Sequence, residues 1–292
     1  MNMTTLFRYI SIFMVSVTSL TACDDAPEFD PPVPVIEGWI DSDGYPNVIF
    51  TSSLIPDGKD CSLADKMIRW GRIEISDGFD TVVLTGRPDK RYFPPYRYDT
   101  FQMKGVPGRT YTIRADYRDF HATATCRMPE PTNIDSISVE RIAGNDTLRA
   151  ATVHFTAPDD VPAYFCLFIS TVSKADAADR PDISRPLPSM LGTAEVTEAG
   201  AHVTIPLFHA KTGTRQGHFV PQLICGETVR AHLCRVTREV YGFYHDYASA
   251  TVFGGNLGTL TGIAGGAPKG NISGGAGIFS AQGTDIRSLT VK

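Results

Sequence analysis

The sequence lacks the short motifs that identify most catalytic and cofactor sites. It contains no HExxH, GxSxG or SxxK motif, no EF-hand loop and no glycine-rich phosphate loop. The adjacent carboxylates Asp159 and Asp160 would point to opposite faces of a strand, whereas a glycosidase needs two carboxyl groups at one bond. We therefore expect a non-enzymatic protein that has no catalytic residues and needs no cofactor or metal ion.

Basic charge and long apolar runs are also scarce. The 292 residues include 27 Lys and Arg against 32 Asp and Glu, which gives a net charge of −5. Because phosphate contacts by Lys and Arg dominate nucleic-acid affinity, this balance argues against nucleic acid as a partner. The one long apolar run, residues 9–20, is too short to span a bilayer.

The apolar run has the size and flanks of a signal peptide, which we place at residues 1–22. It ends in Leu20-Thr21-Ala22-Cys23, which is similar to the bacterial lipobox, where cleavage precedes a cysteine that receives diacylglycerol. We expect Cys23 to be lipidated, because several acyl chains together anchor a protein firmly. The alternative is a plain secretory signal with Cys23 as a spare thiol. Residues 23–32, CDDAPEFDPP, follow as an acidic, flexible tether.

The other cysteines do not define a site. No CxxC motif is present, and the five that remain are Cys61, Cys126, Cys166, Cys225 and Cys234. Their odd number leaves at least one unpaired, and their spacing does not specify disulfide partners. His218 and His232 could join Cys225 and Cys234 at a zinc ion, but zinc ligands usually come in closely spaced pairs. Buried thiols, with one disulfide at most, fit these spacings better.

The mature chain is expected to be mainly β. Short segments of alternating apolar residues, separated by turn signals, recur over residues 33–129 and predict an immunoglobulin- or fibronectin III-like β-sandwich. Within it, Tyr111 follows a Gly-Pro-Gly turn region and is typical of a sandwich corner whose tyrosine hydroxyl bonds to backbone. Pro129 and Pro131 interrupt both helix and strand and mark a linker.

Residues 133–292 predict a second β-rich domain with one short helix. The nearly continuous apolar segment Tyr164–Thr171 is typical of a central strand buried on both faces. A helix is predicted from Thr237, with Val240, Phe243, Tyr244 and Tyr247 on its apolar stripe. Ten glycines lie between residues 254 and 277, and an ordered form of that segment requires close contacts to offset its backbone entropy.

An aromatic and basic segment is the strongest candidate for an interaction surface. Tyr and Arg are enriched at protein interfaces, and tyrosine rings stack on sugars. The alternative is that about half of these rings pack at the sandwich edge. The candidate partner or ligand surface comprises Tyr92, Phe93, Tyr96, Arg97 and Tyr98.

Several segments, taken in order after the lipobox, resemble a family of Bacteroidota lipoproteins grouped as domain of unknown function 4249. They are Pro34–Ile40, Gly108–Ile113, Ile134–Ile137, Gly226–Val229, Thr237–Tyr247 and Asn271–Phe279. The family usually has Leu at the position of Ala276. The resemblance implies an outer-membrane lipoprotein often encoded beside a TonB-dependent receptor, and it supplies no catalytic residues. The acidic run after Cys23 also resembles the surface-export signal of such lipoproteins.

Together these observations predict an accessory lipoprotein on the extracellular face of the outer membrane. It would be held by its N-terminal lipid and would partner a TonB-dependent transporter in capturing an unidentified nutrient. An envelope adhesin or structural β-sandwich lipoprotein is the alternative, because β-sandwiches host many functions. A surface hydrolase with dispersed catalytic residues is a third hypothesis.

Overall fold

The structure is a computed structural model that describes residues 33–53, 66–90, 92, 94–171, 189–207, 214–215, 218–219, 223–252 and 268–292. The signal peptide, Cys23 and the tether, Cys61, Phe93 and residues 253–267 lie outside these ranges. The described residues belong to one compact unit by their contacts. They are mainly β with one short helix, as predicted.

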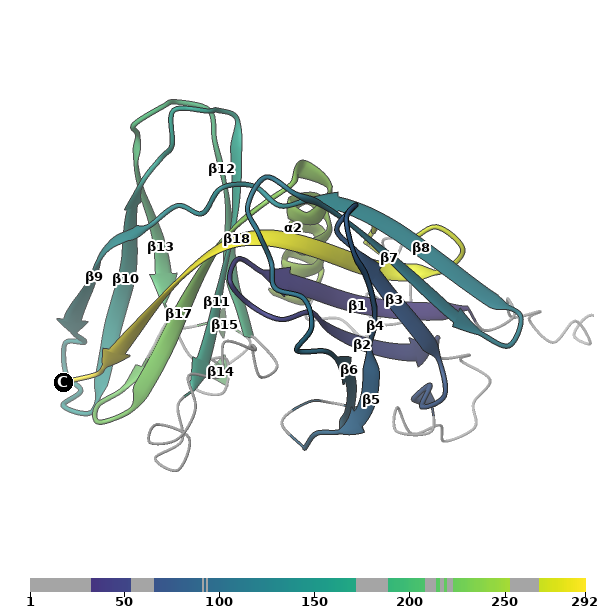
Figure 1. Cartoon of the computed structure of the whole chain (residues 1–292). Coiled ribbons are helices and arrows are strands. Elements are labelled where there is room, and N and C mark those ends of the chain that lie inside the picture. The colour runs from purple at the N-terminus through teal and green to yellow at the C-terminus, as the bar shows by residue number, and fades with distance from the viewer. Residues whose placement is uncertain are drawn as a thin grey trace, which may run out of the picture. The chain divides into compact units, whose positions relative to one another are not determined.

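Among the described residues, eight strands precede the predicted linker, and Figure 1 shows how they are arranged. They are β1 (Pro34–Asp41), β2 (Asn47–Ser52), β3 (Arg72–Ser76), β4 (Thr81–Val83), β5 (Thr85–Pro88), β6 (Tyr96–Asp99), β7 (Thr110–Tyr117) and β8 (Phe120–Arg127). β4, β3, β7 and β8 make a four-stranded sheet, while β1, β2, β6 and β5 belong to an eight-stranded sheet. Apolar side chains from both sheets share one buried core, so this part is sandwich-like. Its immunoglobulin or fibronectin III topology remains a prediction.

Ten further strands follow among the described residues, and most of them surround a second core. They are β9 (Ile134–Arg141), β10 (Leu148–Thr156), β11 (Ala163–Thr171), β12 (Ser189–Val196), β13 (His202–Leu207), β14 (Thr214–Arg215), β15 (His218–Phe219), β16 (Leu223–Ile224), β17 (Thr228–Val236) and β18 (Ala276–Thr290). β10 pairs with β9, β13 and β16, and β12, β11, β17 and β18 continue the eight-stranded sheet.

Strand β11 separates the two cores. Phe165 and Leu167 lie in the second core, whereas Cys166 and Phe168 lie in the first, and all four are at most 1% exposed. Successive side chains of a strand point to opposite faces, so a strand between two cores must be apolar throughout. The prediction of a central strand buried on both faces is confirmed.

Strand β18 joins strands from both sides of the linker. Residues 276–282 pair in parallel with β1, and residues 283–290 pair antiparallel with β17. Figure 1 shows this long yellow strand running beside both neighbours. The glycines that precede Asp285 weaken any local strand pattern, so the sequence alone does not indicate the full length of this strand. The boundary predicted near residues 129–133 falls between β8 and β9, and strands on both sides of it share one sheet.

The glycines of β18 and its approach lie against backbone, as an ordered glycine-rich segment requires. A Cβ at Gly274 would lie 2.1 Å from the carbonyl oxygen of His121, and one at Gly277 would lie 2.0 Å from that of Ile36. Both glycines have positive φ angles, 77° and 102°. The other glycines between residues 254 and 266 fall outside the described residues.

Tyr111 occupies the corner position predicted for it. The residue is fully buried, and burial raises the pKa of its hydroxyl. Its Oη accepts the Val106 N–H at 2.7 Å and donates to the Lys104 carbonyl at 3.3 Å. A buried hydroxyl needs such partners, and these two bonds hold the loop before β7 against the strand.

Helix α2 (Arg238–Val252) begins where predicted. Thr237 Oγ1 accepts the Val240 N–H at 3.5 Å as an N-cap, and Glu239 lies in the first turn. Val240 and Tyr244 are buried in the first core and Phe243 packs against it. Tyr247, predicted on the same stripe, is instead 49% exposed.

The turn between β3 and β4 is held by a buried carboxylate. Asp77 Oδ1 accepts the N–H groups of Phe79 at 3.0 Å and Asp80 at 2.8 Å, and its Oδ2 pairs with Arg109. Desolvation raises the pKa of Asp77, but the two backbone bonds and Arg109 outweigh it, so the net pKa lies below 3.8. The folded protein thus stabilises the ionised form of Asp77 relative to the unfolded chain.

We expect Asp77→Asn to lower the free energy of unfolding at pH 7 by about 1 to 2 kcal/mol, because charged hydrogen bonds become neutral. Since the folded pKa is lowered, the wild-type advantage is present above the unfolded pKa and is lost as pH falls below about 3.8. Urea unfolding at pH 7 and pH 3 measures both effects. Asp80→Asn, in the exposed part of the same turn, is the control. An equal loss at both pH values would contradict the electrostatic account.

Candidate functional site

The aromatic and basic segment predicted as a surface is largely interior. Tyr92 and Tyr98 are each 2% exposed and Arg97 is 7% exposed. Tyr96 is half-buried, and Phe93 lies outside the described residues. The five residues therefore do not form one exposed surface, and the alternative that the rings pack at the sandwich edge describes the buried ones better.

The burial of these residues has a clear cause in a network around Arg97. Its Nη2 lies 3.0 Å from Asp99 Oδ2 and its Nε lies 2.9 Å from Asp89 Oδ2. The guanidinium also lies over the Tyr92 ring at 5.2 Å. A buried cation requires such partners. Arg97 and Tyr92 therefore contribute contacts inside the protein and are not exposed for contact with a partner.

Tyr98 is held in the same interior. Burial raises the pKa of Tyr98 to about 12, so its hydroxyl stays protonated and donates to the Ile68 carbonyl at 2.7 Å. The same oxygen accepts the Gly71 N–H at 3.0 Å. Tyr98 therefore attaches the chain before β3 to β6.

An exposed aromatic group does occur just after this segment. Phe101 is 64% exposed and meets Tyr45 edge-on at 5.1 Å between ring centroids. Arg87 lies over the Phe101 ring at 5.2 Å and Lys104 lies over the Tyr45 ring at 5.3 Å. We call Tyr45, Arg87, Phe101 and Lys104 the Phe101 patch. Aromatic rings beside cations on a protein surface are typical of interaction sites.

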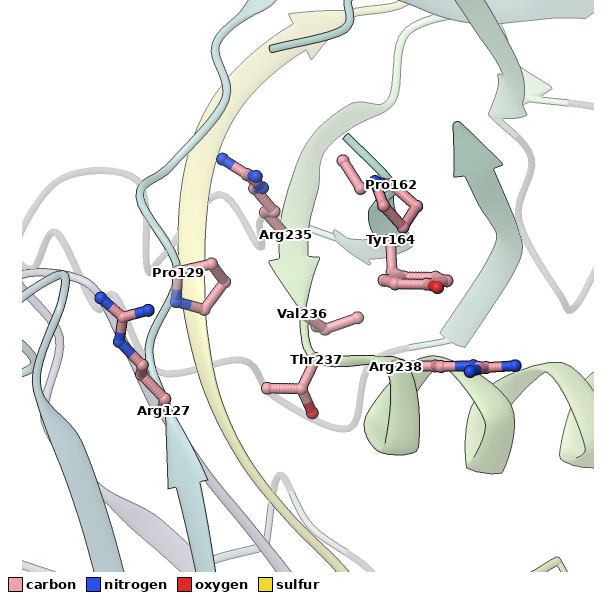
Figure 2. A pocket seen from close by; sticks show the side chains of 9 residues that line it. Arg127, Pro129, Pro162, Tyr164, Arg235, Val236, Thr237 and Arg238 are labelled. Carbon is pink, nitrogen blue, oxygen red and sulfur yellow. The ribbon is translucent and has the colours of Figure 1, made fainter. Parts of the chain in front are cut away.

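A pocket of about 230 Å³ lies at the start of helix α2. Figure 2 shows that its walls come from the end of β8, the start of β11, the end of β17 and the first turn of α2. It is lined by Arg127, Pro129, Pro162, Ala163, Tyr164, Arg235, Val236, Thr237 and Arg238. None of the residues predicted as a site from the sequence lines it.

The pocket carries three arginines, of which one is fixed. The Arg235 side chain is 8% exposed and its Nη2 lies 2.7 Å from Asp160 Oδ2. This hydrogen bond lowers the pKa of Asp160. Arg127 donates from Nε to the Gly108 carbonyl at 3.3 Å. In the part of the chain that the structure describes, neither Arg127 nor Arg238 forms an ion pair.

Chemically, the pocket suits a small anionic group beside an apolar surface. Guanidinium groups bind carboxylate, sulfate and phosphate, and a helix N-terminus favours negative charge. Tyr164 and the two prolines supply the apolar wall. Arg127 precedes Arg235 by 108 positions in the sequence, so no local motif could have predicted that they line one pocket.

The cysteines that the structure describes are thiols. Cys126, Cys166 and Cys234 are buried and Cys225 is exposed. His232 is also buried, and its Nε2 lies 2.9 Å from Ser170 Oγ. No group of three or more His, Cys, Asp or Glu residues that could hold a metal ion occurs among the described residues. His218 belongs to β15, and the structure describes nothing of its side chain.

Two histidines from neighbouring strands, His154 and His202, lie together. His154 Nδ1 lies 3.3 Å from His202 Nε2, and His154 Nε2 lies 2.7 Å from Ser138 Oγ. His154 lies on β10, His202 on β13 and Ser138 on β9, and β10 pairs with both of the other strands in one sheet. The alternation of buried Val153 with polar His154 predicts the outward face of a strand, but local alternation does not identify partners on other strands.

Within the described residues, no helix is long and apolar enough to cross a membrane. A comparison with curated proteins finds no match. A comparison with protein families matches residues 23–287 to a domain of unknown function, DUF4249. This match covers nearly the whole chain and confirms the family that the sequence resembles. The chain therefore belongs to the DUF4249 family.

Proposed function

We propose that this chain is a non-enzymatic lipoprotein of the Bacteroidota outer membrane. Its lipid is attached at Cys23, and the acidic tether places the folded part on the extracellular side. There it partners a TonB-dependent transporter and helps to capture a nutrient.

The lipobox at Leu20–Cys23 carries the proposal. The family match begins at Cys23, the residue that the lipobox makes the first of the mature chain. The first described strand, β1, starts at Pro34, so the proposed tether, residues 23–32, lies between the lipid and the fold. Two surfaces support a binding role: the Phe101 patch offers aromatic contacts, and the pocket at α2 offers arginines.

An affinity pull-down from gently solubilised outer membranes of the native host, read by mass spectrometry, tests the proposal. We expect a TonB-dependent receptor in stoichiometric amount from the wild-type strain and less or none from a Cys23→Ala strain. A chain that is recovered alone would contradict the transporter partnership. Recovery of envelope structural proteins in place of a receptor would favour the adhesin or structural alternative.

We expect Phe101→Ala to lower receptor recovery per recovered lipoprotein by about tenfold or more, the effect of losing an interface hot spot. Because Phe101 is 64% exposed, the variant should keep the wild-type Tm. Phe79, 81% exposed and covered by Arg109 at 4.9 Å, gives a matched control, Phe79→Ala. An equal loss in both variants would show that exposed aromatic area in general, and not the Phe101 patch, binds the receptor.

A further inference from the structure

The pair formed by His154 and His202 has the geometry of a chelating site. Both side chains lie on the outward face of the sheet formed by β9, β10 and β13. They are diagonal neighbours, because His154 is opposite Thr204 and His202 is opposite Thr156. The rings are nearly parallel, at 18°, and their centroids are 5.4 Å apart. A proton shared between Nδ1 and Nε2 accounts for the 3.3 Å separation of these atoms.

The same separation fits a tetrahedral metal ion in place of that proton. Zinc–nitrogen bonds of about 2.0 Å at the tetrahedral angle place two ligand nitrogens about 3.3 Å apart. The observed Nδ1–Nε2 distance is 3.3 Å. Binding of one ion requires the two lone pairs to turn toward a common point, and the His202 ring is exposed.

The surroundings favour a cation at this point. Ser138 Oγ lies 2.7 Å from His154 Nε2, so it can accept the Nε2 proton while Nδ1 remains free to bind metal. Ligand histidines usually donate their second ring N–H in this way. The Asp135 carboxylate accepts a bond from Thr156 Oγ1 at 2.7 Å, and Thr156 faces His202 across the strands. A carboxylate is therefore hydrogen-bonded to the residue opposite His202.

We propose that His154 Nδ1 and His202 Nε2 bind one zinc-class divalent metal ion, whose remaining positions are filled by water. The described residues supply two nitrogen ligands and no third protein ligand, which predicts an open, exchangeable site rather than a structural one. This inference does not rest on the proposed function, since the pair belongs to neither the pocket nor the Phe101 patch.

Isothermal titration of the untagged full chain in detergent with zinc chloride tests the site. We expect one ion per chain, and a loss of affinity of about tenfold or more in His202→Gln and in His154→Gln. Ser138→Ala should weaken binding by about tenfold, because it removes the group that orients His154. His121→Gln is the matched control: His121 is also exposed, but its partner is Asp116 at 2.7 Å.

Cobalt(II) gives an independent readout. A cobalt-loaded wild-type chain should show the visible absorption of tetrahedral coordination, and His154→Gln should lose it while keeping the wild-type Tm. No zinc binding by the wild-type chain would overturn the proposal. Equal binding by His202→Gln would also overturn it, since the ion would then be held by other residues, such as the exposed thiol of Cys225.

Discussion

Replacement of Gly277 by alanine is expected to lower the free energy of unfolding by about 4 kcal/mol, or to prevent folding altogether. Gly277 has a φ of 102°, which residues with a Cβ adopt only at a cost of about 1 to 3 kcal/mol. The added Cβ would also lie 2.0 Å from the Ile36 carbonyl oxygen and 2.8 Å from its carbon. These atoms belong to β1, directly opposite Gly277 in the parallel pairing, so relief requires the two strands to separate.

Gly226→Ala separates the cost of the positive φ angle from the cost of the contact with β1. Gly226 has a φ of 91°, and a Cβ there would meet nothing within 4 Å. Its replacement should cost about 1 to 2 kcal/mol from backbone strain alone. Urea unfolding of both variants gives the difference. Equal losses would contradict the claim that contact with β1 is what makes position 277 intolerant.

Tryptophan fluorescence identifies which part of the fold is disrupted in Gly277→Ala. Trp39 lies on β1 and is 1% exposed, whereas Trp70 is 87% exposed. If Gly277→Ala detaches β18 from β1, emission should shift to the red, because only Trp39 has a dry environment to lose. An unchanged spectrum in a destabilised variant would place the damage elsewhere.

The second large effect is expected from Cys23→Ala, which should transfer the protein from the membrane fraction to the soluble fraction. One myristoyl-sized chain binds membranes with a constant of only about 10⁴ M⁻¹, so firm anchoring needs several chains. The proposed diacylglycerol at Cys23 supplies them, and the described part of the chain contains no membrane-spanning helix. Fractionation and metabolic labelling with a fatty acid measure the change.

Cys225→Ala is the matched control for this experiment. Cys225 is an exposed free thiol in the folded part, so its removal should alter neither labelling nor fractionation. A Cys23→Ala protein that remains in the membrane fraction, or that still takes up label, would show that another feature anchors the chain.

Local pattern was enough to predict the elements whose neighbours follow from burial alone. The uninterrupted apolar run at residues 164–171 implied two buried faces, and β11 has them. Tyr111 implied a backbone-bonded corner, and Val106 and Lys104 provide it. The apolar run requires surroundings without water, and the buried tyrosine hydroxyl requires a hydrogen-bond partner. In both cases a few consecutive residues are enough to predict the requirement.

The candidate site could not be predicted in this way, because it depends on which distant residues meet. Arginine and tyrosine are favoured both at interfaces and in buried networks, so the composition of residues 92–98 does not distinguish the two. The structure shows that Arg97 belongs to the interior, because its guanidinium nitrogens lie 2.9 Å from the Asp89 carboxylate and 3.0 Å from the Asp99 carboxylate. Likewise, the approach of His154 to His202 depends on the register of β10 and β13.

The topology of β18 also sets the order in which the protein can fold during the export that we propose. Gln282 donates to Asp41 across 241 positions of sequence, and β1 lacks its parallel neighbour until residues 276–282 are available to pair with it. Contacts between such distant segments slow folding, because a long loop must close before they form. On the proposed export route β1 therefore lacks this neighbour for most of the passage, and we expect the chain to depend on export chaperones more than a protein folded from local hairpins.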